Sequence, residues 1–399
     1  MKKTAAKASP YRWVVLAAFM LAAIANQLSW IVFAPITSEA MAFYQVSDIM
    51  IGLLSMVFMI VYVLIVLPAA WTIDTLGFRV SVGIGAACTA LGALCRGIFA
   101  GSFPLVFVGQ VIVAIGQPFI LGAVTKLAAE WFPPDERATA SGLGTLSFYV
   151  GILGGLILTP LLASGFGIPS MLLIWGVFAA AVAVLFAILA KDKPSGIRER
   201  TPLFAGLKSM FSNRSFVILL VIFFFGLGAF NGITTWIEQI VRPRGFNAAQ
   251  AGVTGGLMLA GGIAGAFVIP LISDAMRRRK PFIIAAVIGI LPALAGIAFA
   301  RSYGLLLFSS FVFGFFLLSS GPTGFQYGAE ITHPAPEGTS NSFLVVMGQV
   351  SGIALIFAMD AFKGSDGSMT ASLVAIIAMM AFALLISFFL KESPIARRK

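Results

Sequence analysis

The sequence predicts an all-α membrane protein with twelve transmembrane helices in two six-helix bundles related by pseudo-symmetry. Its composition, the length of its apolar runs and a charge pattern that recurs 200 residues further along the chain all predict this fold. Hydrophobic residues make up 59% of the 399 positions and charged residues only 10%. Because soluble domains carry about 25% charged residues, this composition indicates a chain that is surrounded by lipid.

Twelve apolar runs are long enough to cross the hydrocarbon core of a bilayer, which takes roughly 20 helical residues. Each run must be helical, because lipid offers no hydrogen-bond partners to backbone N–H and C=O groups. In chain order the predicted spans are 12–36, 47–71, 79–100, 103–128, 138–164, 169–190, 215–240, 248–272, 281–300, 303–328, 339–362 and 369–390.

A polar segment between the sixth and seventh spans divides the chain. Residues 191–214 contain Pro, Gly and charges of both signs, which is typical of a solvated connector. The sequence therefore predicts an N-terminal six-helix bundle over 1–190, a cytoplasmic linker over 191–214 and a C-terminal six-helix bundle over 215–399.

Acidic residues at the ends of corresponding spans follow the same layout in both halves. Asp74 and Asp274 follow the second and eighth spans, and Glu130 and Glu330 end the fourth and tenth. Both pairs are 200 residues apart, which indicates a duplication. Two similar six-helix halves related by an axis along the membrane normal are the architecture of major facilitator transporters, which this chain resembles.

That resemblance implies a gate built from these charged residues. In the superfamily, the loop acid and the basic residues around it pair with neighbouring helix ends, which assigns gating here to Asp74, Arg79, Glu130, Arg137, Asp274, Arg277 and Glu330. Thr75 stands where the family pattern has an Arg directly after the acid, so the first latch is expected to be the weaker one. The alternative is that the acids only cap helix ends and mark topology. Their recurrence in both halves favours gating.

Basic residues are concentrated in the loops predicted to be cytoplasmic. The net charge of the chain is +11. If the N-terminus is inside, all but five of the 26 Lys and Arg residues lie on the cytoplasmic side. The positive-inside rule therefore predicts a plasma (inner) membrane protein with both termini in the cytoplasm. Nucleic-acid binding needs basic side chains gathered on one folded face, so it is not expected. The expected partners are the lipid bilayer and a small-molecule substrate, and the expected state is a monomer.

The sequence lacks the residues that enzymatic chemistry would need. One His and two Cys cannot form a zinc site with the usual ligand spacing. No Gly-x-x-x-x-Gly-Lys-Ser/Thr loop is present to hold nucleotide phosphates. We therefore expect no metal, no cofactor and no enzymatic activity.

Polar residues inside the spans are expected to line a translocation path, because burying them against lipid is costly. The candidates for substrate binding are Asn26, Gln27 and Trp30 on the first span, Gln117 on the fourth, Tyr149 on the fifth, Asn231 on the seventh and Gln349 on the eleventh.

Acidic residues are almost confined to loops and helix ends. Glu238 and Asp360, near the outer ends of the seventh and eleventh spans, are the candidate proton sites. Proton-coupled transporters place an ionisable group deep in the bundle, and neither acid is clearly at the midplane. We therefore expect facilitative transport, with a proton-coupled exporter of amphipathic compounds or metabolites as the alternative. A non-transporting receptor, which would need an added soluble domain, is a further alternative.

Several segments resemble the feline leukaemia virus subgroup C receptor-related transporters. They run from the first span to the eleventh, at 26–31, 54–62, 68–71, 116–122, 324–325, 330–332 and 337–340. The most specific is Glu-Ile-Thr at 330–332 followed by Glu-Gly-Thr-Ser at 337–340. This resemblance implies transport of choline or ethanolamine by facilitated diffusion; haem export has also been attributed to the family, and a related branch carries a pyridoxine-like substrate.

The resemblance also implies a binding site. In the choline carriers an aromatic pair faces the ammonium group and two glutamines line the site, and the matching positions here are Trp30, Gln117 and Gln349. Asn231 replaces the second aromatic residue, and Phe148-Tyr149 replaces an Asn-Gln pair. A single Trp attracts a quaternary ammonium by about 1–2 kcal/mol. A small polar solute, zwitterionic or amine-bearing, is therefore expected to fit at least as well as choline, and to move by alternating access.

Overall fold

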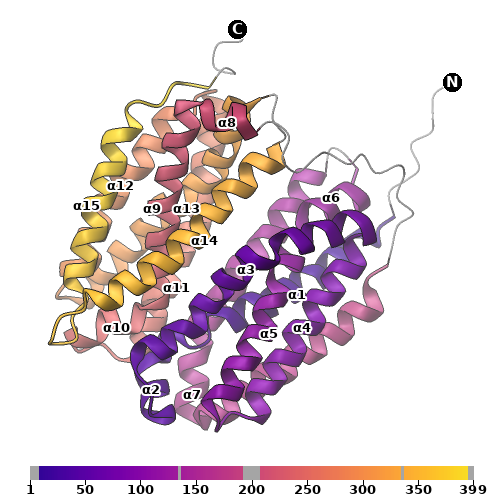
Figure 1. The fold of residues 1–399 in the computed structure, drawn as a ribbon, viewed down its shortest axis with the longest axis vertical. Helices are drawn as coiled ribbons and strands as arrows, with labels where there is room; N and C mark the ends of the chain where they lie inside the picture. The colour runs from indigo at the N-terminus through magenta and orange to yellow at the C-terminus, as the bar shows by residue number, and fades with distance from the viewer. Residues whose placement is uncertain (1–8, 134–135, 192–206, 334–336, 394–399) are drawn as a thin grey trace. The chain divides into compact units, whose positions relative to one another are not determined.

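A computed structural model describes residues 9–133, 136–191, 207–333 and 337–393 (Figure 1). Within these ranges all regular secondary structure is helical. The elements are α1 (Arg12–Ile31), η1 (Ala34–Ile36), α2 (Thr37–Tyr44), α3 (Asp48–Leu76), α4 (Phe78–Ile98), α5 (Phe103–Leu121), α6 (Val124–Trp131), α7 (Arg137–Leu189), α8 (Leu207–Ser212), α9 (Arg214–Thr235), α10 (Ile237–Val241), η2 (Arg242–Arg244), α11 (Ala248–Ala275), α12 (Lys280–Phe299), α13 (Tyr303–Thr332), α14 (Glu337–Ala361) and α15 (Thr370–Ser387).

Eleven of the described helical stretches are long and apolar enough to cross a membrane. One of them, Thr139–Leu189, has 51 residues. At 1.5 Å per residue it is about 76 Å long, more than twice the roughly 30 Å of a bilayer's hydrocarbon core. Gly167 inside it has φ 77° and ψ 161°, so the helix breaks there and forms two crossings. The predicted all-α membrane fold is confirmed, with the fifth and sixth spans joined in α7.

The first and seventh spans are both interrupted near one end. α1 stops at Ile31 because Pro35, four residues later, has no N–H to donate to the carbonyl of Ile31. α9 stops at Thr235, and Trp236 has φ −97° and ψ 17° before α10 begins. The indole Nε1–H of Trp236 donates to the carbonyl of Ile356, 3.1 Å away. Carbonyls at the end of α1 accept hydrogen bonds from side chains of other helices, whereas at the end of α9 the side chain of Trp236 binds a carbonyl of α14.

Contacts between Cα atoms divide the chain into two compact units, each a helical bundle. Unit 1 comprises Met1–Val32, Leu64–Gly155 and Leu161–Arg200, and unit 2 comprises Phe33–Val63, Leu156–Pro160 and Thr201–Lys399. Helix α3 therefore contributes its first part to unit 2 and the rest to unit 1. The domain boundaries at 190 and 215, which the sequence predicts from the linker, stay a prediction.

In unit 1, glycines allow α4 and α5 to pack backbone against backbone. A Cβ on Gly109 would lie 2.7 Å from the carbonyl oxygen of Gly92, and one on Gly116 would lie 2.5 Å from the carbonyl oxygen of Gly85. No side chain larger than hydrogen fits at such distances. Small residues at these positions are the usual means by which membrane helices approach closely.

In unit 2, a similar seam joins α11 and α13. A Cβ on Gly314 would overlap the carbonyl oxygen of Met258, and one on Gly265 would overlap the carbonyl oxygen of Phe315. The two helices therefore depend on glycine in both partners. Asn247 and Gln250 form a capping box that fixes the start of α11.

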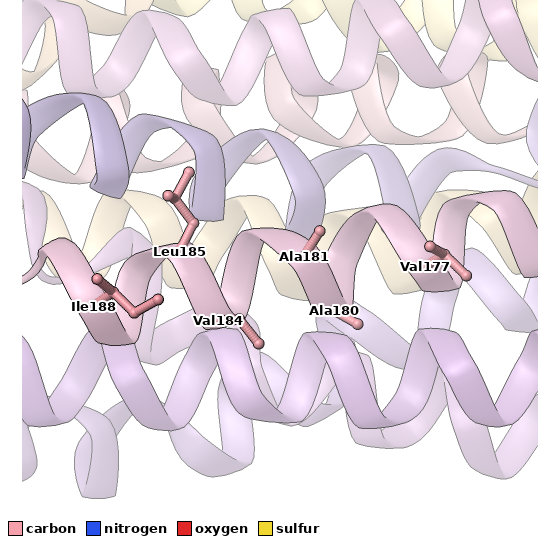
Figure 2. Close-up of a pocket in the computed structure, with 6 residues that line it drawn as sticks. All are labelled: Val177, Ala180, Ala181, Val184, Leu185 and Ile188. Atoms are coloured by element: carbon pink, nitrogen blue, oxygen red, sulfur yellow. The ribbon is translucent and has the colours of Figure 1, made fainter.

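The surface of α7 carries a hollow of about 460 Å³ lined entirely by aliphatic side chains (Figure 2). They come from the part of α7 after Gly167 and are Val177, Ala180, Ala181, Val184, Leu185 and Ile188. Several of them are exposed, as expected for a helix face in contact with acyl chains. With no polar atom contributed by a side chain, this hollow is not a site for a polar solute.

Candidate functional site

The end of α1 supplies the candidate residues Asn26, Gln27 and Trp30, and all three are buried. The amide nitrogen of Asn26 donates to Thr89 Oγ1 at 2.9 Å and to the carbonyl of Val113 at 3.3 Å. Asn26 therefore ties α1 to α4 and α5 inside unit 1. Asn26 Oδ1 and Gln27 Nε2 have no hydrogen-bond partner among the described residues, so they keep hydrogen-bonding capacity.

Trp30, Gln117 and Tyr149 lie on three helices of unit 1. Trp30 is 6% exposed in the last turn of α1, Gln117 is buried in α5 directly before Pro118, and Tyr149 is half-buried in α7. α1 packs against α5. α7 approaches α1 because Gly151 leaves room: a Cβ there would lie 2.6 Å from the carbonyl oxygen of Ile24.

Unit 2 brings the helices of Asn231 and Gln349 together. The amide nitrogen of buried Asn231, in α9, donates at 3.2 Å to the carbonyl of Gly348 in α14. Gln349 is the next residue and is half-buried. A Cβ on Gly352 would lie 2.8 Å from Asn231 Nδ2, so a larger residue there would displace the amide of Asn231.

The candidate substrate residues thus form two sets, one in each unit. Within each set they lie on helices that pack together. Trp30 and Gln117 belong to unit 1, whereas Asn231 and Gln349 belong to unit 2. That the two sets meet at one site stays a prediction.

Glu238, a candidate proton site, is 3% exposed and extensively hydrogen-bonded. Its Oε2 accepts from Ser38 Oγ at 2.7 Å, from the backbone N–H of Ser38 at 3.2 Å and from Gln239 Nε2 at 3.1 Å. Arg242, one turn later, lies 3.6 Å from Oε1. Oε2 of Glu238 therefore accepts from three donors. Ser38 was not among the residues selected from the sequence.

A second ionic contact lies beside Glu238 in unit 2. Lys363 forms an ion pair with Asp48 and donates to Gln239 Oε1 at 3.2 Å. Asp360, the other candidate proton site, is half-buried on α14, one turn before Lys363. The polar groups from Ser38 to Lys363 thus link α2, α3, α10 and the end of α14.

Two candidate gating residues of unit 2, Asp274 and Glu330, meet through Arg279. Its guanidinium pairs with Asp274, whose side chain is 61% exposed, and reaches Glu330 at 3.2 and 3.3 Å, whose side chain is 4% exposed. Burial alone would lower the pKa of Arg279, but the hydrogen bonds and charges of these two acids raise it above its ordinary value. Arg277, selected from the sequence, is exposed and adopts φ 51°.

The repeat in the sequence contains a signal for Arg279. Arg79 was selected in the first half, and the 200-residue offset of the repeat maps it onto Arg279. The backbone N–H groups of Arg279 and Lys280 also bind Glu392 Oε1, at 2.9 and 3.2 Å.

The gating residues of unit 1 are arranged differently. Asp74 and Arg79 are exposed. Lys126 and Glu130 lie 3.7 Å apart, and Arg137 donates to the carbonyl of Phe132 at 3.1 Å. The bidentate ion pair of this unit joins two other residues: Arg12 donates to both carboxylate oxygens of Glu136, at 2.8 and 3.0 Å.

No group of three or more His, Cys, Asp or Glu side chains that could hold a metal ion occurs in the described parts of the chain. The groups that remain for recognition of a ligand are one indole, several amides and hydroxyls. They suit a small polar molecule held by hydrogen bonds and by the face of an aromatic ring.

Comparisons with known proteins identify the class of molecule to which this arrangement belongs. Solute carrier family 49 member A3 of Danio rerio is 31% identical over 381 residues, which cover 90% of this chain and 80% of that protein. The choline/ethanolamine transporter FLVCR2 of Homo sapiens is 28% identical over 376 residues, 87% of this chain and 71% of the relative. The chain thus resembles the family that its sequence motifs indicated.

Among solved structures, the fold is similar to a bacterial homolog of the human lysosomal transporter Spinster, in an inward-facing and unoccupied conformation. The TM-score is 0.76 at 17% sequence identity, and the match covers 98% of both chains. The family model of the Major Facilitator Superfamily matches residues 19–356. The helical architecture, the relatives and this match together show that the chain belongs to the Major Facilitator Superfamily.

Proposed function

We propose that the protein is a secondary transporter that moves a small polar or amine-bearing organic solute by alternating access, down the gradient of the solute itself. Membership of a transporter family makes it a membrane transporter and not an enzyme. The observation that carries the substrate class is Trp30, which is buried at the end of α1 and whose carbonyl accepts from the amide of Gln110. A relative of known substrate, FLVCR2, is a choline/ethanolamine transporter.

The proposed binding residues are those that the sequence indicated. Trp30 offers its ring face to an ammonium group, Gln117 and Gln349 offer amides, and Asn231 adds hydrogen-bonding capacity where the choline carriers have a second aromatic residue. Gln27 supports this assignment because its amide nitrogen is buried without a hydrogen-bond partner among the described residues. A buried donor without a hydrogen-bond partner lowers the stability of the folded protein by about 1–3 kcal/mol unless a ligand or water binds it.

A transport assay in proteoliposomes tests the substrate class. Radiolabelled choline and ethanolamine are the first probes, followed by zwitterionic amines. Trp30→Ala is expected to weaken choline binding about tenfold, because cation–π attraction to a desolvated Trp is worth about 1–2 kcal/mol. Ligand-induced thermal stabilisation of the purified protein gives the affinity independently of transport.

Trp71→Ala is the matched control, since Trp71 is an exposed indole on α3. It should bind and transport choline like the unsubstituted protein. If both variants lose choline binding equally, or if neither loses it, Trp30 is not part of the substrate site. If no amine stabilises the protein, the substrate class is wrong.

The second candidate is a proton-coupled exporter of amphipathic compounds or metabolites, and the burial of Glu238 favours it. We expect facilitation instead, because Glu238 lies outside the long helix α9 and its carboxylate already has several donors. An imposed pH gradient should then drive no accumulation of a neutral substrate above equilibrium. The membrane potential should act only through the charge of the substrate, about 2.3 kcal/mol per charge per 100 mV.

Accumulation driven by the pH gradient and abolished by Glu238→Gln would establish the exporter in place of the facilitator. Asp360→Asn is the matched comparison, since Asp360 is the other candidate proton site and is half-buried. If only the second substitution abolishes accumulation, the coupling site lies on α14.

The gating proposal accompanies this mechanism. Asp74, Asp274 and the basic residues near them are proposed to latch the cytoplasmic side of the transporter. The protein is proposed to be a monomer in a plasma (inner) membrane, with both termini in the cytoplasm. The contacts of Arg279 with Asp274 and Glu330 support a latch in the second half. Arg12 and Glu136 offer a comparable ion pair in the first.

A further inference from the structure

The last turn of α1 is held by side chains from two other helices of unit 1. The final four carbonyls of an α-helix have no partner within the helix. Arg96, in α4, donates from Nη1 to the carbonyl of Ser29 at 2.9 Å. Gln110, in α5, donates from Nε2 to the carbonyls of Ser29 and Trp30, both at 3.4 Å. The carbonyls of two consecutive residues, one of them Trp30, are therefore bound from outside the helix.

Arg96 and Gln110 also bind each other. The Nη1 of Arg96 donates to Gln110 Oε1, which orients the amide so that its Nε2 faces α1. Arg96 is 1% exposed. A buried guanidinium is costly unless acceptors surround it, and the C-terminus of a helix supplies acceptors and the negative end of the helix dipole.

The close packing of α4 and α5 makes this arrangement possible. A Cβ on Gly109 would lie 2.8 Å from Arg96 Cγ, so the stem of Arg96 crosses α5 where that helix has no side chain. Gly92 and Gly109 bring the two backbones together at the same level. The guanidinium thereby reaches α1, which a shorter or differently placed base would not.

We propose that Arg96, both directly and through Gln110, is a positioning residue that fixes the last turn of α1 and with it the indole of Trp30. The position of the indole decides the strength of a cation–π contact, because the cation must lie over the ring face within about 6 Å of its centre. Only the step from indole position to substrate affinity rests on the proposed function. The positioning itself is a property of unit 1.

Arg96→Lys and Gln110→Glu separate positioning from charge and size. Lysine keeps the positive charge, but a flexible and strongly hydrated ammonium replaces the planar, pre-organised guanidinium whose Nη1 binds both acceptors. Glutamate keeps the volume and the oxygen that accepts from Arg96, but it has no N–H for the carbonyls of α1. Both variants should loosen the last turn of α1.

The direct readout is ¹⁹F NMR of protein labelled with 5-fluorotryptophan. The chain has six Trp, so six signals are expected, and Trp30→Phe assigns the one from Trp30. In both variants this signal should shift and broaden more than the other five. Arg244→Lys is the matched control. Arg244, in unit 2, donates from Nη1 to the carbonyl of Ile297 in the last turn of α12, at 2.6 Å. It should leave the Trp30 signal unchanged.

An unchanged Trp30 signal in both variants would overturn the proposal. Loss of dispersion of all six signals in both would also overturn it, since that result shows a general structural role. If Arg96→Lys fails to fold and Gln110→Glu folds, the Trp30 signal of the Gln110→Glu variant tests the proposal.

A choline titration separates this proposal from the proposed function. Arg96→Lys should raise the apparent Kd for choline about tenfold, and it should have no further effect in a protein that already carries Trp30→Ala. If the Trp30 signal responds to Arg96→Lys but not to choline, positioning stands and the substrate site fails. If choline moves the Trp30 signal and Arg96→Lys does not, the substrate site stands and positioning fails.

Discussion

Gly314→Ala is expected to destabilise the protein by about 3 kcal/mol, one of the two largest effects of a single substitution that we anticipate. The added methyl group would overlap the backbone carbonyl oxygen of Met258, and a backbone atom cannot move aside as a side chain can. Overpacking of this kind usually costs about 1–3 kcal/mol. Here α11 and α13 would have to separate along the seam that also contains Gly261 and Gly265. Thermal and chemical unfolding in detergent measures the change.

Gly304→Ala is the matched control on the same helix, since Gly304 is not followed by a proline. Nothing lies within 4 Å of the position where its Cβ would be built, so the methyl group meets open space. Alanine favours helix over glycine by about 1 kcal/mol, and the control should be neutral or slightly stabilising. Equal stability of the two variants would show that the seam is not as tight as the structure has it.

Arg279→Gln is expected to cost about 3 kcal/mol, because it leaves the carboxylate of Glu330 buried without its basic partner. Breaking a buried ion pair from one side costs about 3–5 kcal/mol. The lower end applies here, since Glu330 also accepts from Gln326 Nε2 at 2.9 Å and from the Ser393 hydroxyl. Adding Glu330→Gln to the variant should recover part of the loss, which a double-mutant cycle measures.

Arg277→Gln is the control two residues away. Arg277 is exposed, and an exposed substitution usually changes stability by less than about 0.5 kcal/mol. If Arg277→Gln costs as much as Arg279→Gln, the acids of this cluster depend on Arg277, and the ion pairs of Arg279 contribute little.

The sequence predicted the two acids that meet at Arg279, but not the basic residue that holds them. Asp274 and Glu330 were found from the repeat, because a duplication leaves a fixed offset in the chain. Which of the neighbouring bases reaches both acids depends on the turn between α11 and α12. Arg277 has a left-handed backbone conformation there, and Arg279 folds back toward the acids.

The candidate substrate site was predictable only as a set of residue types. Hydropathy places Asn26 and Trp30 on one helix, but it does not say which of them packs inside unit 1. The structure shows that Asn26 binds Thr89 and Val113, whereas Gln27 keeps an unbonded amide nitrogen. A polar side chain is costly to expose to lipid whether it joins two helices or binds a substrate. The sequence alone therefore does not separate the two kinds of residue.

The sequence by itself determined the class of the molecule: its helices, their approximate ends, its duplication and its place in lipid. These are local properties, because an α-helix satisfies its hydrogen bonds within a few residues and the length of an apolar run decides whether it spans. The tertiary structure alone decided which distant residues meet, such as Ser38 with Glu238 and Arg96 with the last turn of α1. Such contacts depend on the distance between packed helices, and glycines at the contact between two backbones set this distance. The pattern of residues along a single segment does not encode which segment packs against it.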